Sequence, residues 1–541
     1  MTDSNETSVP GGDVGMTAET GRTNRHTGWT FVLALAGVLA FATALRLYGL
    51  GEPDFWLDEL HSMANSAARR GEFESPGYRT ILEFSRGTTD LTPDSNWSAV
   101  WRGMRNDSHP PTYFLLLQSW RKLVGDGEFA VRLLPMIFSI LSLVPFALIL
   151  REYRRPMVGI AGAALLAMTF CHIRFAQDNR PYSLALLLLV ISYWTFVKMQ
   201  LGWEGHTRRE RIVWVAVYCM ATYLSVMTHY FTGAVLAGQA VLITAPGARP
   251  FRRAWIIAVA ATFLTFVLTW GQQLVGQWEF IANQEWLYDR RPTHALHTLL
   301  HMADLPARML FWHRPAAPHY AASLGGAVLW AAALLAMGRR GDRAAKLFAV
   351  WYLLPVLLFA VIDLTTQMRL LSELRYLSIA APGFVGMIVL AAARLRGRRG
   401  WIAIGAAVLV SAFTLHLPTP WNPRGRRAAK YIAAQWQPGD LLVFDGTDWP
   451  PYWARHTYQI AAYYLSELTT IDPPVALISE PPDADFQKAM AAFDRLIVVS
   501  PRIGESCNPV PDTFRHIDKT GNVLLMGEIH LFDRLPAGQP P

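Results

Sequence analysis

Two adjacent carboxylates, Asp58 and Glu59, follow the first long apolar segment of the sequence. Carboxylates are costly in hydrocarbon, so we expect the pair to lie in a polar pocket at a membrane surface, where they could transfer protons. The apolar residues of 60–67 recur at helical spacing, which predicts an amphipathic helix that begins beside Asp58. The alternative is that Asp58 only caps this helix and that Glu59 is a solvated neighbour.

Further polar residues stand in short turns beside apolar segments. They are His109, Asp178, Arg180, Tyr182, His229, Tyr230, Arg375 and Tyr376. Because short turns hold their side chains at the membrane surface, these groups could converge beside Asp58. The alternatives are structural: a local hydrogen bond for His109, an ion pair between Asp178 and Arg180, an interfacial aromatic pattern at 229–230, and a snorkelling Arg375.

Three histidines, His294, His297 and His301, would share one face of a helix over 293–302. Such a face suggests a metal site, for which Asp304 is the nearby carboxylate. We favour the alternative, a polar helix face.

The composition is that of a polytopic membrane protein. Of the 541 residues, 52% are hydrophobic and 17% are charged. The net charge of +8 is therefore interpreted by its position in loops and not as a sign of nucleic-acid binding. The cysteines, Cys171, Cys219 and Cys507, suggest neither a disulfide framework nor a zinc cluster.

About eleven segments have roughly the length and apolar character of membrane spans. They are 29–45, 129–150, 157–175, 181–200, 212–227, 231–245, 254–275, 320–337, 347–362, 376–393 and 401–417. The apolar stretch 111–124 is short, and we interpret it as an interfacial helix on the outer surface.

Basic clusters occupy every second connection between these segments, at 151–155, 208–211, 249–253, 339–346 and 394–399. Cytoplasmic loops carry the excess of Lys and Arg, so these connections and the N-terminus should face the cytoplasm. The connections with acids and aromatics, among them 50–128, should face outward together with everything after 417.

Three regions follow from this pattern. We predict that residues 1–28 form a disordered cytoplasmic leader, since they contain no apolar run. Residues 29–417 form the transmembrane domain; we favour an uncleaved first span over a signal peptide. Residues 418–541 alternate helical and strand-like pieces, with strands at 440–444 and 496–500, and predict an extracytoplasmic α/β domain.

Several short motifs resemble those of membrane glycosyltransferases with the GT-C fold. They are Trp56-x-Asp58-Glu59, His109-Pro110-Pro111-x-Tyr113, Gly125-Asp126-x-Glu128-Phe129-Ala130-x-Arg132-Leu133, Gln177-Asp178-x-Arg180-x-Tyr182, His229-Tyr230-Phe231 and Arg375-Tyr376-Leu377. Within this fold the chain resembles glycosyltransferase family 39, which contains the protein O-mannosyltransferases and the lipid A aminoarabinose transferases, and especially its bacterial branch. The resemblance covers residues 30 to about 415 and does not extend to the C-terminal domain.

The resemblance implies transfer of a sugar from a polyprenyl-phosphate carrier to a hydroxyl of an envelope lipid, glycan or protein. The reaction would take place on the outer face of a bacterial inner membrane. It would be a direct displacement with inversion, because no second carboxylate is placed as a nucleophile. Asp58 would be the general base, with Glu59 and Asp178 in the catalytic group. The donor phosphate and substrate would bind His109, Arg180, Tyr182, His229, Tyr230, Arg375 and Tyr376. A divalent cation shared by Asp58 and Asp178 is an open alternative.

Two other classes of protein are alternatives. A transporter or lipid flippase would also have many spans, but it would favour inverted repeats and charges within spans, which the sequence does not show. A sensor or scaffold that presents an outer domain would not need acids and bases beside a carboxylate pair.

Overall fold

The computed structural model describes residues 16–395 except 75–76, 155, 246–247 and 311–341. It also describes 398–400, 402, 405, 424–447, 453–500, 510–524 and 527–536. The predicted span at 320–337 lies outside the described residues, as does that at 401–417 apart from 402 and 405.

Six helical segments are long and apolar enough to cross a membrane among the residues described. They are Gly28–Leu47 within α1 (Met16–Leu47), α6 (Glu128–Tyr153), α9 (Tyr182–Gly202), α12 (Arg252–Ala282), α15 (Arg343–Thr366) and Leu374–Ala393, which contains α16 (Leu374–Leu377) and α17 (Ala381–Ala393). Two shorter apolar helices accompany them, α7 (Pro156–Met168) and α11 (Thr232–Leu242). The chain is therefore a multi-pass membrane protein, with fewer full-length apolar helices in its described part than the prediction of about eleven spans.

The differences from the predicted spans have local causes. The segment 157–175 divides into α7 and α8 (Phe170–Arg174) because Thr169 has extended backbone angles between them. The segment 212–227 is helical, as α10 (Arg208–Val226), but it is not among the helices apolar enough to span. Helix α1 begins at Met16, so the end of the predicted disordered leader is helical; a helix already nucleated by an apolar segment extends at little cost.

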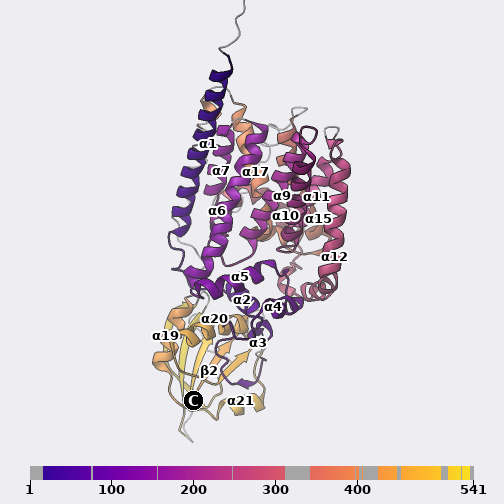
Figure 1. Ribbon diagram of the computed structural model, residues 1–541. Coiled ribbons are helices and arrows are strands. Elements are labelled where there is room, and N and C mark those ends of the chain that lie inside the picture. Colours follow the sequence, from indigo (N-terminus) through magenta and orange to yellow (C-terminus); the bar gives the residue numbers. More distant parts are fainter. Residues whose placement is uncertain are drawn as a thin grey trace, which may run out of the picture.

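Short helices between α1 and α6 lie across one end of the bundle. They are α2 (Leu57–Ser66), α3 (Arg70–Glu74), α4 (Trp97–Gly103), η1 (Met104–Asn106) and α5 (Thr112–Val124). Figure 1 shows α2, α4 and α5 between the long helices and the C-terminal part of the chain. The segment 111–124 is helical, as α5. This helix buries Tyr113 and Phe114 and leaves Leu123 exposed, so it is amphipathic.

The C-terminal part contains a mixed sheet flanked by helices. Its elements are α19 (Gly425–Gln435), β2 (Asp440–Asp445), α20 (Trp453–Leu468), β3 (Val475–Ile478), α21 (Ala484–Met490), β4 (Arg495–Ser500), β5 (Phe514–Leu524) and β6 (Gly527–Arg534). The predicted strands at 440–444 and 496–500 are confirmed as β2 and β4, which are paired in parallel and almost fully buried. The strand order is β1-β3-β2-β4-β6-β5, and β1 (Ile81–Leu82) comes from the loop after α3.

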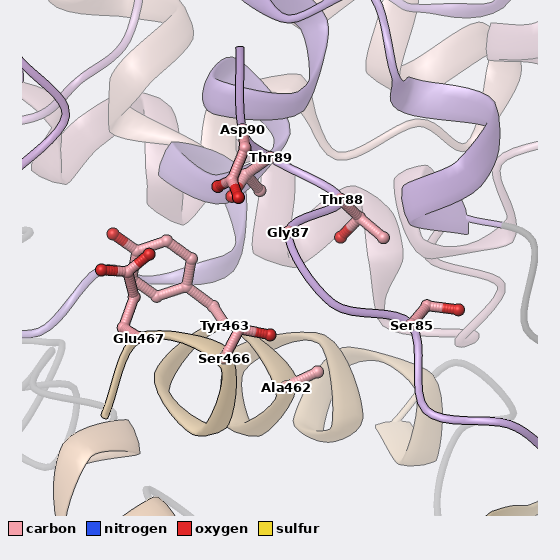
Figure 2. A pocket seen from close by; sticks show the side chains of 9 residues that line it. All are labelled: Ser85, Gly87, Thr88, Thr89, Asp90, Ala462, Tyr463, Ser466 and Glu467. Carbon is pink, nitrogen blue, oxygen red and sulfur yellow. The ribbon is translucent and has the colours of Figure 1, made fainter. Parts of the chain in front are cut away.

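Helix α20 joins the sheet to the loops between α1 and α6. The loop 85–90 and α20 enclose a small pocket, and Figure 2 shows the carboxylates of Asp90 and Glu467 on the same side of it. Arg426 N, at the start of α19, donates to Asp54 Oδ2 at 3.0 Å. Because these contacts include residues just before α2, the sheet domain is fixed beside the segment that carries Asp58.

Candidate active site

The side chains of Asp58 and Arg375 meet at the end of the bundle that faces the sheet domain. Asp58 lies in the first turn of α2, and Arg375 lies in α16. Arg375 Nη1 donates to Asp58 Oδ2 at 2.6 Å, and the two side chains remain 16% and 22% exposed. The residue at the N-cap of α2 is Trp56, so Asp58 is not the cap of this helix. The carboxylate of Asp58 therefore contacts Arg375, a residue distant in sequence, and does not cap its own helix.

Electrostatics keep Asp58 ionised. Burial alone would raise the pKa of Asp58, but the charges of Arg375 and Arg180 outweigh this effect and hold the pKa below its ordinary value. The guanidinium of Arg375 is itself surrounded by the rings of Trp56, Trp286 and Tyr376, at 5.9, 5.4 and 5.3 Å from their centroids. These aromatic faces favour a cation at this position.

Glu59 makes a different set of contacts. Arg132 of α6 donates to both of its oxygens, from Nε at 2.7 Å and from Nη2 at 2.6 Å. Asn179 N donates to Oε1 at 2.9 Å. The side chains of Glu59 and Arg132 are only 1% and 3% exposed. Glu59 is therefore not a solvated neighbour; it connects α2 to α6 and to the turn at 178–181.

Arg132 is a residue to which the sequence analysis assigned no role, although it belongs to one of the motifs. Besides Glu59, it donates to the backbone oxygens of Leu50 and Pro53, at 3.1 and 2.8 Å. A buried Arg with both carboxylate and carbonyl acceptors holds several segments in register. The only feature of the sequence that could have pointed to Arg132 is its position in the motif at 125–133.

The turn at 178–181 directs Asp178 and Arg180 to separate partners. Trp56 Nε1 donates to Asp178 Oδ1 at 2.8 Å. Arg180 Nη1 donates to the backbone oxygen of Asp58 at 2.9 Å and to Ser62 Oγ at 3.1 Å. The loop-fixing ion pair between Asp178 and Arg180 is therefore not formed. Burial, together with the nearby charge of Glu59, raises the pKa of Asp178 to about 6.

His109 is oriented by Asp107, another residue that the sequence analysis did not select. His109 Nδ1 lies 3.0 Å from Asp107 Oδ1, and Arg180 Nη2 lies 3.3 Å from His109 Nε2. Since Arg can only donate, Nε2 must accept and the proton must be on Nδ1. Burial and the charge of Arg180 lower the pKa of His109, in keeping with a neutral ring.

His229, Tyr182 and Tyr376 complete the group around Asp58. The centroid of the His229 ring lies 5.3 Å from that of His109, 5.6 Å from Tyr182 and 6.2 Å from Tyr376. Tyr230 does not join them. Its hydroxyl accepts from Trp270 Nε1 at 2.6 Å and donates to Gln277, so it packs against α12 instead.

Three buried N–H groups of this cluster have no hydrogen-bond partner within the described part of the chain. They are Nε of Arg180, Nε of Arg375 and Nε2 of His229. Phe231 N donates to His229 Nδ1 at 3.3 Å, which puts the histidine proton on Nε2. Leaving a buried donor unpaired costs about 1–3 kcal/mol. Three such donors near one carboxylate indicate a site for a ligand rich in acceptors.

The histidines of α13 (His294–Leu310) do not form the metal site considered above. His294 Nε2 contacts the backbone oxygen of Asp363 at 2.9 Å, and Asp304 pairs with Arg308 at 2.8 Å. Across the described residues, no group of three or more His, Cys, Asp or Glu side chains could hold a metal ion.

Comparisons with known proteins identify the fold. Residues 108–271 match the family model described as dolichyl-phosphate-mannose-protein mannosyltransferase. No curated protein matches the chain in sequence. ArnT from Cupriavidus metallidurans in the apo state is similar in structure, with a TM-score of 0.55, 13% identity, and coverage of 94% of this chain and 98% of that chain. The chain has the GT-C fold.

Two further solved structures are similar to this GT-C protein. The same ArnT bound to undecaprenyl phosphate gives a TM-score of 0.54 at 13% identity, covering 93% of this chain and 98% of that one. The Archaeoglobus fulgidus oligosaccharyltransferase tethered to an acceptor peptide gives 0.44 at 12% identity, covering 86% and 68%. The resemblance to GT-C membrane glycosyltransferases of the protein O-mannosyltransferase and ArnT group, predicted from the motifs, is confirmed.

Proposed function

We propose that this GT-C protein is a glycosyltransferase that takes a sugar from a polyprenyl-phosphate donor and transfers it to a hydroxyl acceptor on the outer face of a bacterial inner membrane. The observation that carries the proposal is the set of three unpaired donors, on Arg180, Arg375 and His229, beside the ionised Asp58. A phosphate group offers several strong acceptor oxygens to such donors. The ArnT structure with bound undecaprenyl phosphate supports the same class of donor.

The chemistry assigned to Asp58 is removal of the acceptor proton. The acceptor oxygen forms a bond to the anomeric carbon of the sugar while the bond from that carbon to the phosphate oxygen breaks. The proton passes to Asp58, and the released phosphate keeps the electron pair. Arg375 and Arg180 stabilise the negative charge that develops on the phosphate. Direct displacement inverts the anomeric configuration.

The other residues of the group serve this reaction through position. Glu59, fixed by Arg132, holds the first turn of α2. Asp178 fixes the Trp56 indole, whose ring lies beside Arg375. Tyr182 and Tyr376 form walls around His229. The arginines supply positive charge to the phosphate, so we propose that no divalent cation is required.

The proposed topology puts the N-terminus in the cytoplasm and residues 418–541 outside. Arg154 and Arg394 both form ion pairs with Asp342, which joins three of the connections predicted to be cytoplasmic. In Figure 1 the start of α1 and the sheet lie at opposite ends of the bundle. Both observations support the orientation derived from the basic loops.

The test is a comparison of cell-envelope glycans by mass spectrometry. A deletion strain should lack a sugar residue that the wild-type gene restores and that the Asp58→Asn gene, expressed at the same level, does not. A transporter or flippase is distinguished by purified protein: only a transferase moves radiolabelled sugar from the lipid to an acceptor without a membrane barrier. Identical envelopes in wild-type and deletion strains, and no transfer by pure protein, would exclude the proposal.

A further inference from the structure

The segment 53–56 lies between α1 and α2, the helix that carries Asp58. It belongs to no helix or strand, so contacts with other parts of the chain must fix its backbone. Trp56, at its end, is the N-cap of α2, and Asp58 follows two residues later. The conformation of 53–56 therefore determines where the first turn of α2 and the carboxylate of Asp58 are placed.

Arg132 of α6 supplies contacts to this segment from the membrane domain. It donates to the backbone oxygens of Pro53 and Asp54, at 2.8 and 3.3 Å. Its guanidinium also lies 5.2 Å from the centroid of the Phe55 ring. These contacts use two backbone oxygens and one ring. The N–H of Phe55 and the carboxylate of Asp54 have their partners elsewhere.

The C-terminal domain supplies those partners. Tyr464 Oη, on α20, accepts a hydrogen bond from Phe55 N at 2.6 Å. Arg426 N, at the start of α19, donates to Asp54 Oδ2 at 3.0 Å, and Arg426 Nη1 lies 3.6 Å from Asp54 Oδ1. Figure 1 shows α20 between the sheet and α2. Two helices of the C-terminal domain thus hold two consecutive residues of the segment.

Glu128, the first residue of α6, connects these contacts to the membrane domain. Because Tyr464 Oη accepts from Phe55 N, its own proton is available, and it donates to Glu128 Oε1 at 2.9 Å. Arg426 Nη2 forms an ion pair with the same oxygen of Glu128. Phe55 and Tyr464 are both almost fully buried. Removing the hydroxyl would therefore leave a buried N–H without an acceptor, which is unfavourable.

Electrostatics keep the Tyr464 hydroxyl in this role. Burial, with the negative charges of Glu128 and Asp54, raises the pKa of Tyr464, so the hydroxyl stays protonated. It can then accept from Phe55 and donate to Glu128 at the same time. The guanidinium of Arg426 lies 5.4 Å from the centroid of the Tyr464 ring, which holds the two side chains together.

The segment 53–56 is also connected to the proposed reaction centre. The Trp56 indole donates to Asp178 Oδ1 at 2.8 Å, and its ring lies 5.9 Å from the guanidinium of Arg375. Arg375 in turn contacts Asp58 Oδ2 at 2.6 Å. A displacement of Phe55 would move its neighbour Trp56 and the first turn of α2. A misplacement of about 1 Å at a reacting group can lower a rate on the order of 10²-fold.

We propose that Tyr464, supported by Arg426, is a positioning residue for the transfer reaction: its hydroxyl fixes Phe55 and thereby holds Asp58 in place beside Arg375. This inference rests on the proposed function. Tyr464 acts through the segment 53–56 and not through the substrates, so it affects the rate of transfer and not the binding of the donor. The C-terminal domain is then part of the catalytic unit, although it lies outside the region matched by the family model.

The test is transfer by the full-length Tyr464→Phe protein in detergent. The donor probe is radiolabelled polyprenyl-phosphate sugar prepared from the source membranes, and the acceptor probe is envelope material from the deletion strain. We expect kcat at saturating substrates to fall roughly 10- to 100-fold. The affinity for undecaprenyl phosphate, measured by calorimetry, should not change.

The dependence of kcat on pH separates positioning from a general loss of structure. Burial alone would raise the pKa of Asp58, and the charge of Arg375 is the largest effect that opposes it. If Tyr464→Phe separates Asp58 from Arg375, the pKa of Asp58 rises, and activity is lost at a higher pH on acidification than in the wild type. Loss of folded protein would lower kcat equally at every pH. The groups whose charges interact with Asp58 are Arg375, Arg180, His61, His109 and, from α20, His456.

Tyr463→Phe is the matched control, since it removes the same hydroxyl from the neighbouring residue of α20. The Tyr463 ring lies 5.5 Å from that of Phe55, but in the described part of the chain its hydroxyl forms no hydrogen bond with 53–56. Tyr463 lines the small pocket between the loop 85–90 and α20 (Figure 2). This variant should keep the kcat, the affinity for undecaprenyl phosphate and the pH profile of the wild type.

Arg426→Gln tests the same contacts through a side chain that is 38% exposed, so folding is less at risk. It should lower kcat and move the acidic side of the pH profile in the same direction, and Arg426→Lys should restore part of the loss. If Tyr464→Phe does not accumulate in the membrane, Arg426→Gln decides, and a wild-type kcat and pH profile in that variant would overturn the inference.

Three further results would count against the inference. A wild-type kcat in Tyr464→Phe would overturn it and leave the proposed function intact. A reduced kcat with an unchanged pH profile, or with an equal loss of undecaprenyl phosphate binding, would also overturn it, because Tyr464 would then only support the structure. Absence of transfer by the wild-type protein would overturn the proposed function and this inference together.

Discussion

Arg375 Nη1 donates to Asp58 Oδ2 at 2.6 Å, across 317 residues of sequence. This contact joins the proposed general base to a proposed ligand of the donor phosphate. While the pair is intact, the positive charge of Arg375 lowers the pKa of Asp58 and makes it a weak base. A donor phosphate that shares Arg375 would reduce this effect. Donor binding is thus expected to increase the basicity of Asp58.

Asp58→Asn should abolish most of the transfer activity. The amide keeps the size of the side chain and can still accept a hydrogen bond from Arg375, but it cannot take the acceptor proton. We expect the rate to fall by a factor on the order of 10²–10⁴, the usual contribution of a positioned base. The measurement is kcat with a lipid-linked sugar donor, at membrane levels of protein matched by immunoblot. Near wild-type turnover would show that Asp58 only supports the structure.

Arg375→Ala should weaken use of the donor more than use of the acceptor. A charge-assisted hydrogen bond is worth about 1.5–3 kcal/mol, so the apparent donor affinity should fall roughly 10- to 100-fold. Arg375→Lys should restore only part of this loss, because Lys supplies charge without the planar fork of Arg. Rates are measured against donor concentration at fixed acceptor. If donor affinity is unchanged and only protein abundance falls, the phosphate site should be sought at Arg180 and His109.

Glu59 and Arg132 should behave as a buried structural pair. Glu59→Gln leaves the Arg132 guanidinium buried without its counter-charge, which typically costs about 3–5 kcal/mol. The double variant Glu59→Gln/Arg132→Met should be less destabilised than the sum of the single variants. Thermal unfolding in detergent measures all three. A Glu59→Gln protein that melts like the wild type but has lost kcat would instead indicate a direct catalytic role.

Local sequence patterns were sufficient for the helices and for most of the cluster around Asp58. In the described part of the chain, apolar segments of membrane length fall on helices, and the short turns bring His109, Arg180, His229 and Arg375 together as expected. These predictions succeeded because hydropathy and turn length are properties of neighbouring residues.

Contacts between distant segments could not be predicted in this way. The two-residue strand β1 has no alternation that would mark it, and it exists because Ile81 pairs with Ala476. The role of Asp107 depends on the orientation of His109. Tyr230 was grouped with its neighbour His229, yet it packs against α12, since the sequence does not show in which direction adjacent side chains of a turn point.

The proposed topology can be tested with reporter fusions. Fusions after Arg155, Arg253 and Arg399 should report the cytoplasm, and a fusion after Leu417 should report the exterior. The physical reason is the excess of Lys and Arg in the first set of connections. Paired reporters that are active on opposite sides of the membrane provide the internal control. An exterior signal at any of the first three positions would contradict the topology.

The last prediction concerns Asp178 and the dependence of stability on pH. Burial raises its pKa from 3.8 to about 6 in the folded protein, so the folded state binds more protons than the unfolded state between these values. The stabilisation that comes from protonated Asp178 is therefore complete below about pH 4 and is lost as the pH rises through 6. This loss amounts to about 3 kcal/mol at most, in view of the 1.36 kcal/mol that corresponds to each pKa unit. The Asn side chain of Asp178→Asn is neutral at every pH. The stability of this variant should therefore not show this decrease as the pH rises.

Thermal unfolding of the wild type and of Asp178→Asn at pH 5 and pH 7.5 measures the difference. The wild type should lose more stability than the variant between the two pH values. Asp94→Asn, which removes the same charge from an exposed position, should follow the wild type. If the wild type and Asp178→Asn lose stability in parallel, Asp178 is ionised throughout this range. Its carboxylate would then be a second negative charge beside Glu59, and the Trp56 indole would be held by an ionic acceptor at every pH tested.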